Sequence, residues 1–73
     1  MANYYVQILR INHDPRGHQI LSRIVQGRDE DEIKKKVSSY YGSSRASVGV
    51  LMCQVATDQQ LNSSKIKHLN FEQ

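Results

Sequence analysis

The segment from residue 29 to residue 42, DEDEIKKKVSSYYG, is the only part of the chain with a full set of helix signals. Asp29 is a preferred N-cap residue, and Glu32 follows it at the spacing of a capping box. Acids on the first turn favour the positive end of the helix dipole. Acid–lysine pairs at i,i+4 add support, and they are Glu30 with Lys34, Asp31 with Lys35, and Glu32 with Lys36. The segment therefore predicts one helix.

The apolar residues of this segment recur at helical spacing. Ile33, Val37, Tyr40 and Tyr41 form one stripe, which predicts an amphipathic helix that buries one side. Gly42 is placed to end the helix with a residue in the left-handed conformation.

The segments on either side of the helix have the composition of strands. The predicted strands cover residues 4–12, 18–26, 46–57 and 65–71. The sequence Asp14-Pro15-Arg16-Gly17 fits a type I turn between the first two. A short helix that starts near Asp58 is the alternative for the C-terminal part. Residues 1–73 therefore predict a small single α+β domain of order β-β-α-β-β, with an antiparallel or mixed sheet and one amphipathic helix on one face.

The predicted turn also predicts a register for the first hairpin. Ile11 should lie opposite Ile20, and Leu9 opposite Ser22, so these side chains share one face of the sheet. We expect the helix to cover this face. The opposite face collects apolar residues and two arginines, namely Tyr4, Val6, Ile8, Arg10, Leu21, Arg23 and Val25.

Neither face of the predicted sheet has the polar composition of a solvated surface. The third strand is also apolar on both sides, with Val48, Val50 and Met52 on one and Leu51, Cys53 and Val55 on the other. A sheet with one solvated face normally alternates between apolar and polar residues. The second face should therefore be covered by the C-terminal segment, a second copy of the chain or a partner. A slip or bulge in the first strand would exchange the faces.

Arg10 and Arg23 make this second face the candidate binding face. Arginine among apolar and aromatic residues is typical of the core of a protein interface. RNA lying across the sheet is the alternative, because arginine and aromatic side chains stack on bases. Tyr4 is the only aromatic residue on this face, which favours a protein partner. In the simplest interpretation the two arginines only extend over a partly exposed sheet.

Three lysines on the predicted helix form a secondary basic surface, Lys34, Lys35 and Lys36. They are expected to be mainly a solvated, acid-paired face of the helix. The formal net charge of +3 permits contact with nucleic acid or with an acidic protein and requires neither.

No combination of residues predicts catalysis or a cofactor. His13, His18 and His68 lack the fixed ligand set that zinc needs, so no metal site is expected. Cys53 lies within a predicted apolar strand and is expected to be an unreactive thiol. The acids from residue 29 to residue 32 are explained by the helix dipole. The sequence therefore predicts a non-enzymatic protein.

The function expected from these observations is binding. A lone cysteine indicates a reducing compartment, and no signal peptide or membrane segment is recognised, so the cytoplasm is the expected location. We expect protein–protein interaction as a regulator or inhibitor, of the kind that phages and mobile elements encode, with a homodimer as one form of it. A small basic nucleic-acid-binding domain is the second hypothesis.

Overall fold

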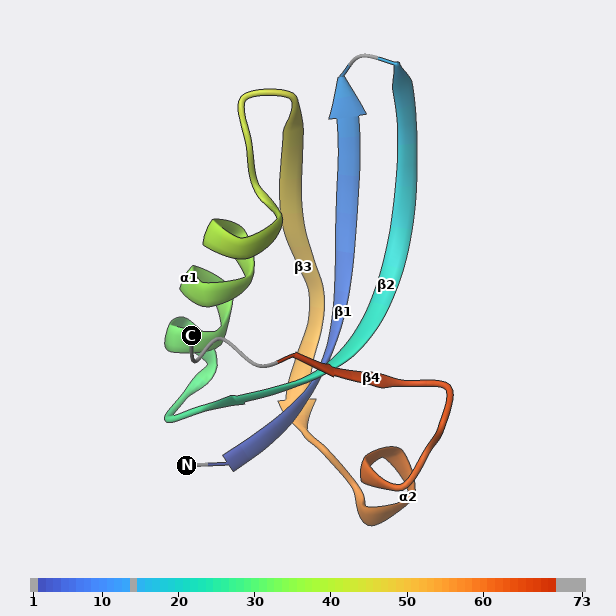
Figure 1. The fold of residues 1–73 in the computed structure, drawn as a ribbon. Helices are drawn as coiled ribbons and strands as arrows, with labels where there is room; N and C mark the ends of the chain where they lie inside the picture. Colours follow the sequence, from blue (N-terminus) through green and yellow to red (C-terminus); the bar gives the residue numbers. More distant parts are fainter. Residues whose placement is uncertain (1, 14, 70–73) are drawn as a thin grey trace.

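In the computed structural model, the described residues, 2–13 and 15–69, form four strands and two helices (Figure 1). The elements are β1 Ala2–His13, β2 Arg16–Gly27, α1 Glu30–Tyr41, β3 Ala46–Val55, α2 Asp58–Leu61 and β4 Lys67–Leu69. The predicted α+β class and the order of the main elements are confirmed. The short helix α2 is an addition to that order.

The four strands form one mixed sheet in the order β3-β1-β2-β4. β1 is the central strand and runs antiparallel to both β2 and β3. β4 runs parallel to β2 and pairs with it over Arg23–Val25 alone. The connection from β2 through α1 to β3 therefore joins two parallel strands across β1, and it carries α1 over one face of the sheet (Figure 1).

The N-terminus of α1 is capped as the sequence predicts. The Asp29 carboxylate accepts a hydrogen bond from the backbone N–H of Glu32 at 2.9 Å. The Glu32 carboxylate does not turn back to the cap. It pairs with Arg28 at 2.6 Å and with Lys36 at 3.0 Å. The hydrogen bonds from Arg28 and Lys36 lower the pKa of Glu32 to about 2.

The C-terminus of α1 differs from its prediction. Gly42 has φ −72° and ψ 145°, which is extended backbone, so the predicted left-handed cap is wrong. The N–H of Gly42 still donates to the carbonyl of Ser38 at 2.9 Å. A Cβ at Gly42 would overlap that same carbonyl oxygen, so glycine is required here by lack of space rather than by a positive φ.

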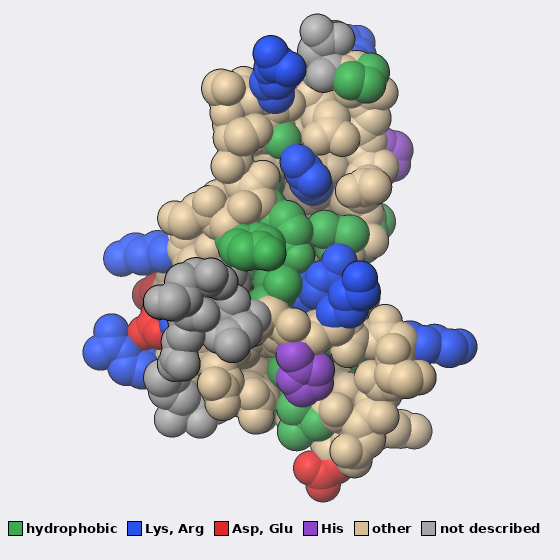
Figure 2. All heavy atoms as spheres, viewed as in Figure 1, with side chains coloured by type: hydrophobic (Ala, Val, Ile, Leu, Met, Phe, Trp, Pro, Cys, Tyr) green, Lys and Arg blue, Asp and Glu red, His purple; other side chains and the backbone are tan. Residues whose placement is uncertain are grey.

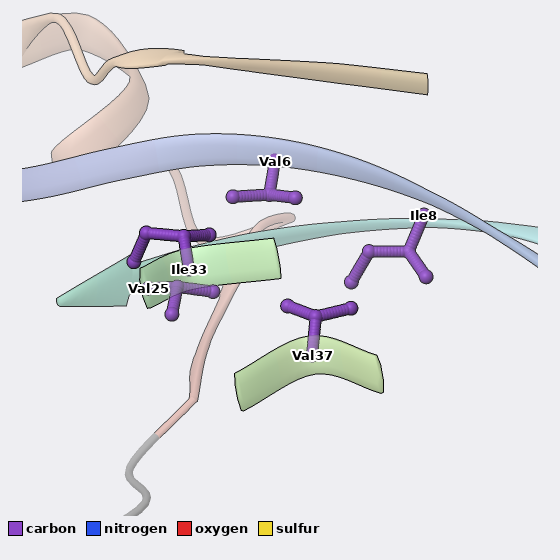
Figure 3. Close-up of a cluster of buried hydrophobic side chains, with 5 residues drawn as sticks. All are labelled: Val6, Ile8, Val25, Ile33 and Val37. Carbon is purple, nitrogen blue, oxygen red and sulfur yellow. The ribbon is translucent and has the colours of Figure 1, made fainter. Parts of the chain in front are cut away.

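The core lies between α1 and one face of the sheet (Figure 3). Val6, Ile8 and Val25 come from the sheet and point toward Ile33 and Val37 of α1, and all five are fully buried. The expectation that α1 covers the face with Leu9 and Ile11 is therefore wrong. The helix lies on the other face, for which the C-terminal segment, a second copy of the chain or a partner was the expected cover.

The side chains in the half of the hairpin that α1 contacts explain why the helix covers this face. On the side away from α1 that half carries Tyr5, Gln7 and Ser22, which bond to one another through their polar groups. The side toward α1 carries β-branched residues that pack tightly. Gly27 lets the helix approach, because a Cβ there would lie 2.6 Å from Cδ1 of Ile33.

A β-bulge in β3 redistributes its side chains. Gln7 pairs with Met52 and Ile8 pairs with Val50, so Leu51 is the extra residue. Val48, Val50 and Cys53 consequently all pack at the edge of the core. The predicted grouping of Met52 with Val48 and Val50, and of Cys53 with Leu51, is therefore wrong.

The C-terminal part contains both a short helix at Asp58 and a short strand, which were the two alternatives predicted for it. α2 is capped by Thr57, whose hydroxyl accepts from the N–H of Gln60, while the side chain of Gln60 accepts from the N–H of Thr57. The predicted strand over residues 65–71 is present only as the short β4. Leu69 packs against the core, and residues 70–71 lie outside the described residues.

Candidate functional site

The register of the β1–β2 hairpin determines which side chains share the uncovered face. Ile11 lies opposite His18 and Leu9 lies opposite Ile20, whereas Ile11 was predicted opposite Ile20. Strand pairing continues to His13 and Arg16, so the connection is shorter than the predicted turn; Asp14 lies outside the described residues. A shift of two residues leaves every side chain on its predicted face, because side chains alternate with a period of two.

We call the uncovered face of this hairpin, with the bulge residue of β3, the open face. It is lined by Leu9, Ile11, His13, Arg16, His18, Ile20 and Leu51. Among these, Ile20 is 60% exposed, Leu51 53% and Ile11 43%. They surround a shallow concavity of about 940 Å³. Aliphatic side chains gathered at this exposure on one face are typical of an interaction surface.

Polar groups surround the apolar part of the open face at the hairpin end. A ring nitrogen of His13, Nε2, lies 2.9 Å from the hydroxyl of Ser47 on β3, which links the first and third strands there. Arg16 and His18 are exposed on β2. The open face therefore has an aliphatic centre and a rim of hydrogen-bonding and basic side chains, an arrangement common in protein interfaces.

On the same side of the sheet, away from the hairpin end, polar side chains hydrogen-bond to one another and do not form an apolar surface. The hydroxyl of Tyr5 donates to Ser22 Oγ at 3.2 Å, and Gln7 Nε2 donates to the Tyr5 hydroxyl at 3.1 Å. The hydrogen bonds with Ser22 and then Gln7 lower the pKa of Tyr5. Ile24, between Tyr5 of β1 and His68 of β4, is buried. These groups confine the open face to the hairpin end.

The predicted binding face is divided by the helix. Val6, Ile8 and Val25 belong to the core and cannot contact a partner. Tyr4 and Leu21 are half-buried against that core. The proposal of a contiguous binding face made of these residues is therefore corrected, because α1 already covers most of it.

The two arginines of that face remain at its margin. Arg10 lies opposite Gln19 and Val48, toward the hairpin end and away from the core centre. Its Nε is buried without a hydrogen-bond partner among the described residues. Arg23 donates from Nη1 to the carbonyl of Ser22 at 2.8 Å. No described carboxylate lies within ion-pair distance of either guanidinium.

The three lysines of the predicted secondary basic surface differ in exposure and pairing. Lys34 and Lys35 are exposed, whereas Lys36 is half-buried and paired with Glu32. Of the three predicted acid–lysine pairs this is the one found among the described residues. Lys36 also reaches the carbonyl of Gln26 at 3.4 Å, so its role is to hold α1 to the end of β2.

The remaining candidate groups are separated from one another. Within residues 2–13 and 15–69, no group of three or more His, Cys, Asp and Glu side chains is placed to hold a metal ion. Burial raises the pKa of the Cys53 thiol, which keeps it protonated and weakly nucleophilic at neutral pH.

Sequence reasoning missed Ile20 as a surface residue, because it was expected on the face under the helix. It grouped Leu51 with Cys53 and Val55 on one side of the third strand and did not single it out as exposed. The signal for the bulge that exposes Leu51 was the run of apolar residues of both parities in β3. None of the helices in the described part of the chain has the length and apolar character needed to cross a membrane. Comparison with protein-family models, curated proteins and solved structures finds no match to this chain.

Proposed function

We propose that this protein is a non-enzymatic binding domain that acts through protein–protein interaction, with the open face as its binding surface. The observation that carries the proposal is the exposure of Ile11, Ile20 and Leu51 around one concavity, on the sheet face that α1 leaves uncovered. Burial of such aliphatic side chains gives about 1.5–3 kcal/mol each when it is complete. A protein surface of matching shape supplies that burial.

The character of the open face favours a protein partner over nucleic acid. Its centre is aliphatic and its lining contains no Phe, Tyr or Trp, while His13, Arg16 and His18 lie at its rim. Proteins that bind single-stranded nucleic acid stack bases on aromatic side chains across the binding surface. Two tyrosines, Tyr40 and Tyr41, lie edge to face with ring centroids 4.9 Å apart on α1, away from this face. Nucleic-acid binding therefore stays the second hypothesis.

A regulator or inhibitor is the role that suits a short chain with a single binding surface. Its partner is another protein or a second copy of the chain, since a two-fold dimer needs only one self-complementary patch. The single thiol, Cys53, is compatible with a reducing compartment such as the cytoplasm.

The test compares two matched substitutions at exposed apolar positions. The double variant Ile20→Thr with Leu51→Thr removes aliphatic groups from the open face and leaves a β-branched threonine at both positions, which maintains strand propensity. Val55→Thr makes the same kind of change at a residue that is 64% exposed and outside the concavity.

Sedimentation measures self-association, and quantitative mass spectrometry of proteins co-purified from cells that naturally express the chain measures partner binding. We expect the open-face variant to lose at least one association that Val55→Thr retains, while circular dichroism shows both variants folded. The proposal is wrong if every association of the parent survives in the open-face variant.

A further inference from the structure

The outer edge of β2 is only partly occupied. β4 pairs with β2 at Arg23–Val25, and the described residues provide no sheet partner along the preceding stretch, Arg16–Ser22. Figure 1 shows this part of β2 running past β4 toward the hairpin end. Its backbone N–H and C=O groups are available to an added strand. Because β4 already uses the same edge, the edge is competent for pairing.

The two sides of this free edge differ in chemistry. Ile20 and His18 project on the side of the open face. Gln19, Leu21 and Arg23 project on the side of α1, with Arg10 across the hairpin from Gln19. An added strand along Arg16–Ser22 would therefore meet Ile20, flanked by Arg16 and His18, on one side and Gln19 and Leu21 on the other. Arg10 lies one strand further in on that second side, and Arg23 lies just beyond the free stretch, where β4 begins to pair.

Acidic residues are distributed unequally between the two ends of the sheet. The described ionisable residues around the hairpin end are all basic: Arg10, His13, Arg16, His18 and Arg45. The sequence has one acid there, Asp14. The acids of α1 lie at the opposite end of the sheet, where β2 leads into the helix. Figure 2, which views the α1 side, shows basic side chains at the hairpin end and acidic ones only in the lower part.

The two guanidinium groups lack anionic partners within the described chain. Arg23 reaches only the carbonyl of Ser22, and the buried Nε of Arg10 makes no hydrogen bond. A buried donor without a partner costs about 1–3 kcal/mol. The buried Nε of Arg10 is out of reach of an added group, but a carboxylate from outside the chain would neutralise the charge of the two guanidinium groups.

Building on the proposed function, we infer that the partner contributes an acidic segment with alternating aliphatic side chains, which binds in extended form along the free edge of β2. Backbone hydrogen bonds to Arg16–Ser22 supply affinity, as in other cases of strand addition. An aliphatic side chain covers Ile20, and carboxylates on the other side of the added strand extend toward Arg10 across the hairpin and toward Arg23 at the end of the free stretch.

The test uses synthetic peptides as probes with the full chain. A fluorescein-labelled peptide of about twelve residues that alternates glutamate and valine can form such a strand. Its controls are a lysine–valine peptide, a glutamate–serine peptide and the glutamate–valine peptide with N-methylated backbone amides. Fluorescence anisotropy measures the affinity of each at low and at physiological salt.

Charge reversal on the protein provides the matched variants. Arg23→Glu places an acid beside the free edge, and Lys35→Glu makes the same change of net charge on the exposed surface of α1. We expect Arg23→Glu to weaken binding of the glutamate–valine peptide about tenfold and to gain binding of the lysine–valine peptide. Lys35→Glu should leave affinity within about twofold of the parent, since its site is distant and screened by salt.

Two results would overturn the inference. One is that the glutamate–valine peptide binds no better than its lysine, serine or N-methylated controls. The other is that labelled single-stranded RNA binds more tightly than the peptide and competes for the same site. In either case, partner loss in the variant Ile20→Thr with Leu51→Thr would leave the proposed function intact. If that variant also kept every association of the parent, both the inference and the proposed function would be overturned.

Discussion

The position of the core is tested by removing the same group from each face of β1 and β2. Ile8 and Ile20 lie on opposite faces, and Ile8 is fully buried whereas Ile20 is 60% exposed. Substitution of either by alanine removes three carbon atoms. At about 0.8 kcal/mol for each buried CH₂ group, the transfer contribution at Ile8 is about 2.4 kcal/mol. The cavity left beneath α1 raises the loss to about 3–4 kcal/mol.

The same truncation at Ile20 should cost much less. Less than half of that side chain is covered, so the transfer contribution falls to about 1 kcal/mol, and no cavity forms at a surface position. A domain of this length is stable by about 4–11 kcal/mol. Ile8→Ala should therefore remove a large part of the free energy of unfolding.

Urea unfolding followed by circular dichroism measures both losses. With a slope of about 1 kcal/mol per molar urea, Ile8→Ala should lower the midpoint by about 3 M and Ile20→Ala by about 1 M or less. Equal losses, or a larger loss at Ile20, would show that α1 covers the face with Leu9 and Ile11, and would refute the fold described here.

Further predictions concern the approach of α1 and its N-terminal ion pairs. Gly27→Ala should destabilise the fold by about 1–3 kcal/mol in urea unfolding, because its Cβ would meet Ile33, while Gly17→Ala, with open space around it, should stay close to the parent. The pKa of Glu32 is lowered in the folded state from 4.5 to about 2, so the stability that its ion pairs contribute is present above pH 4.5 and is lost as pH falls toward 2. Thermal unfolding from pH 7 to pH 2 should thus show a steeper loss for the parent than for Glu32→Gln, and parallel curves would contradict this assignment.

The sequence predicted the elements well, because their signals are local. The N-cap at Asp29, the stripe of Ile33 and Val37 and the strand composition around them depend on neighbouring residues only. The grouping of side chains on the two faces of the hairpin was also correct. It survived a register error of two residues, since that shift preserves the alternation.

The choice of face could not be made from composition. Both faces of the hairpin carry several apolar residues, and they differ clearly only in the half near α1, with Val6 and Ile8 on the covered side and Tyr5 and Gln7 on the other. Right-handed crossovers between parallel strands would select the face for the helix. To use this rule, one must know for each residue of β1 whether its N–H and C=O groups bond to β2 or to β3, which is its hydrogen-bonding class. That class depends on the register, and the bulge at Leu51 changes it within β3.

Under the proposed function, binding of a partner at the open face would also raise the free energy of unfolding. α1 covers the half of the sheet near the start of β1, and the hairpin end projects beyond it with Ile11 and Ile20 exposed. At the hairpin end β1 pairs with both β2 and β3, and this three-stranded part of the sheet leaves apolar side chains exposed on its open face. A partner that covers the open face therefore stabilises the hairpin end as well as gaining affinity, and at a hundred times its Kd it raises the free energy of unfolding by about 2.7 kcal/mol. Under the proposed function, the exposed aliphatic residues of the open face form the surface for a partner, so binding should depend on the hairpin end rather than on the helix.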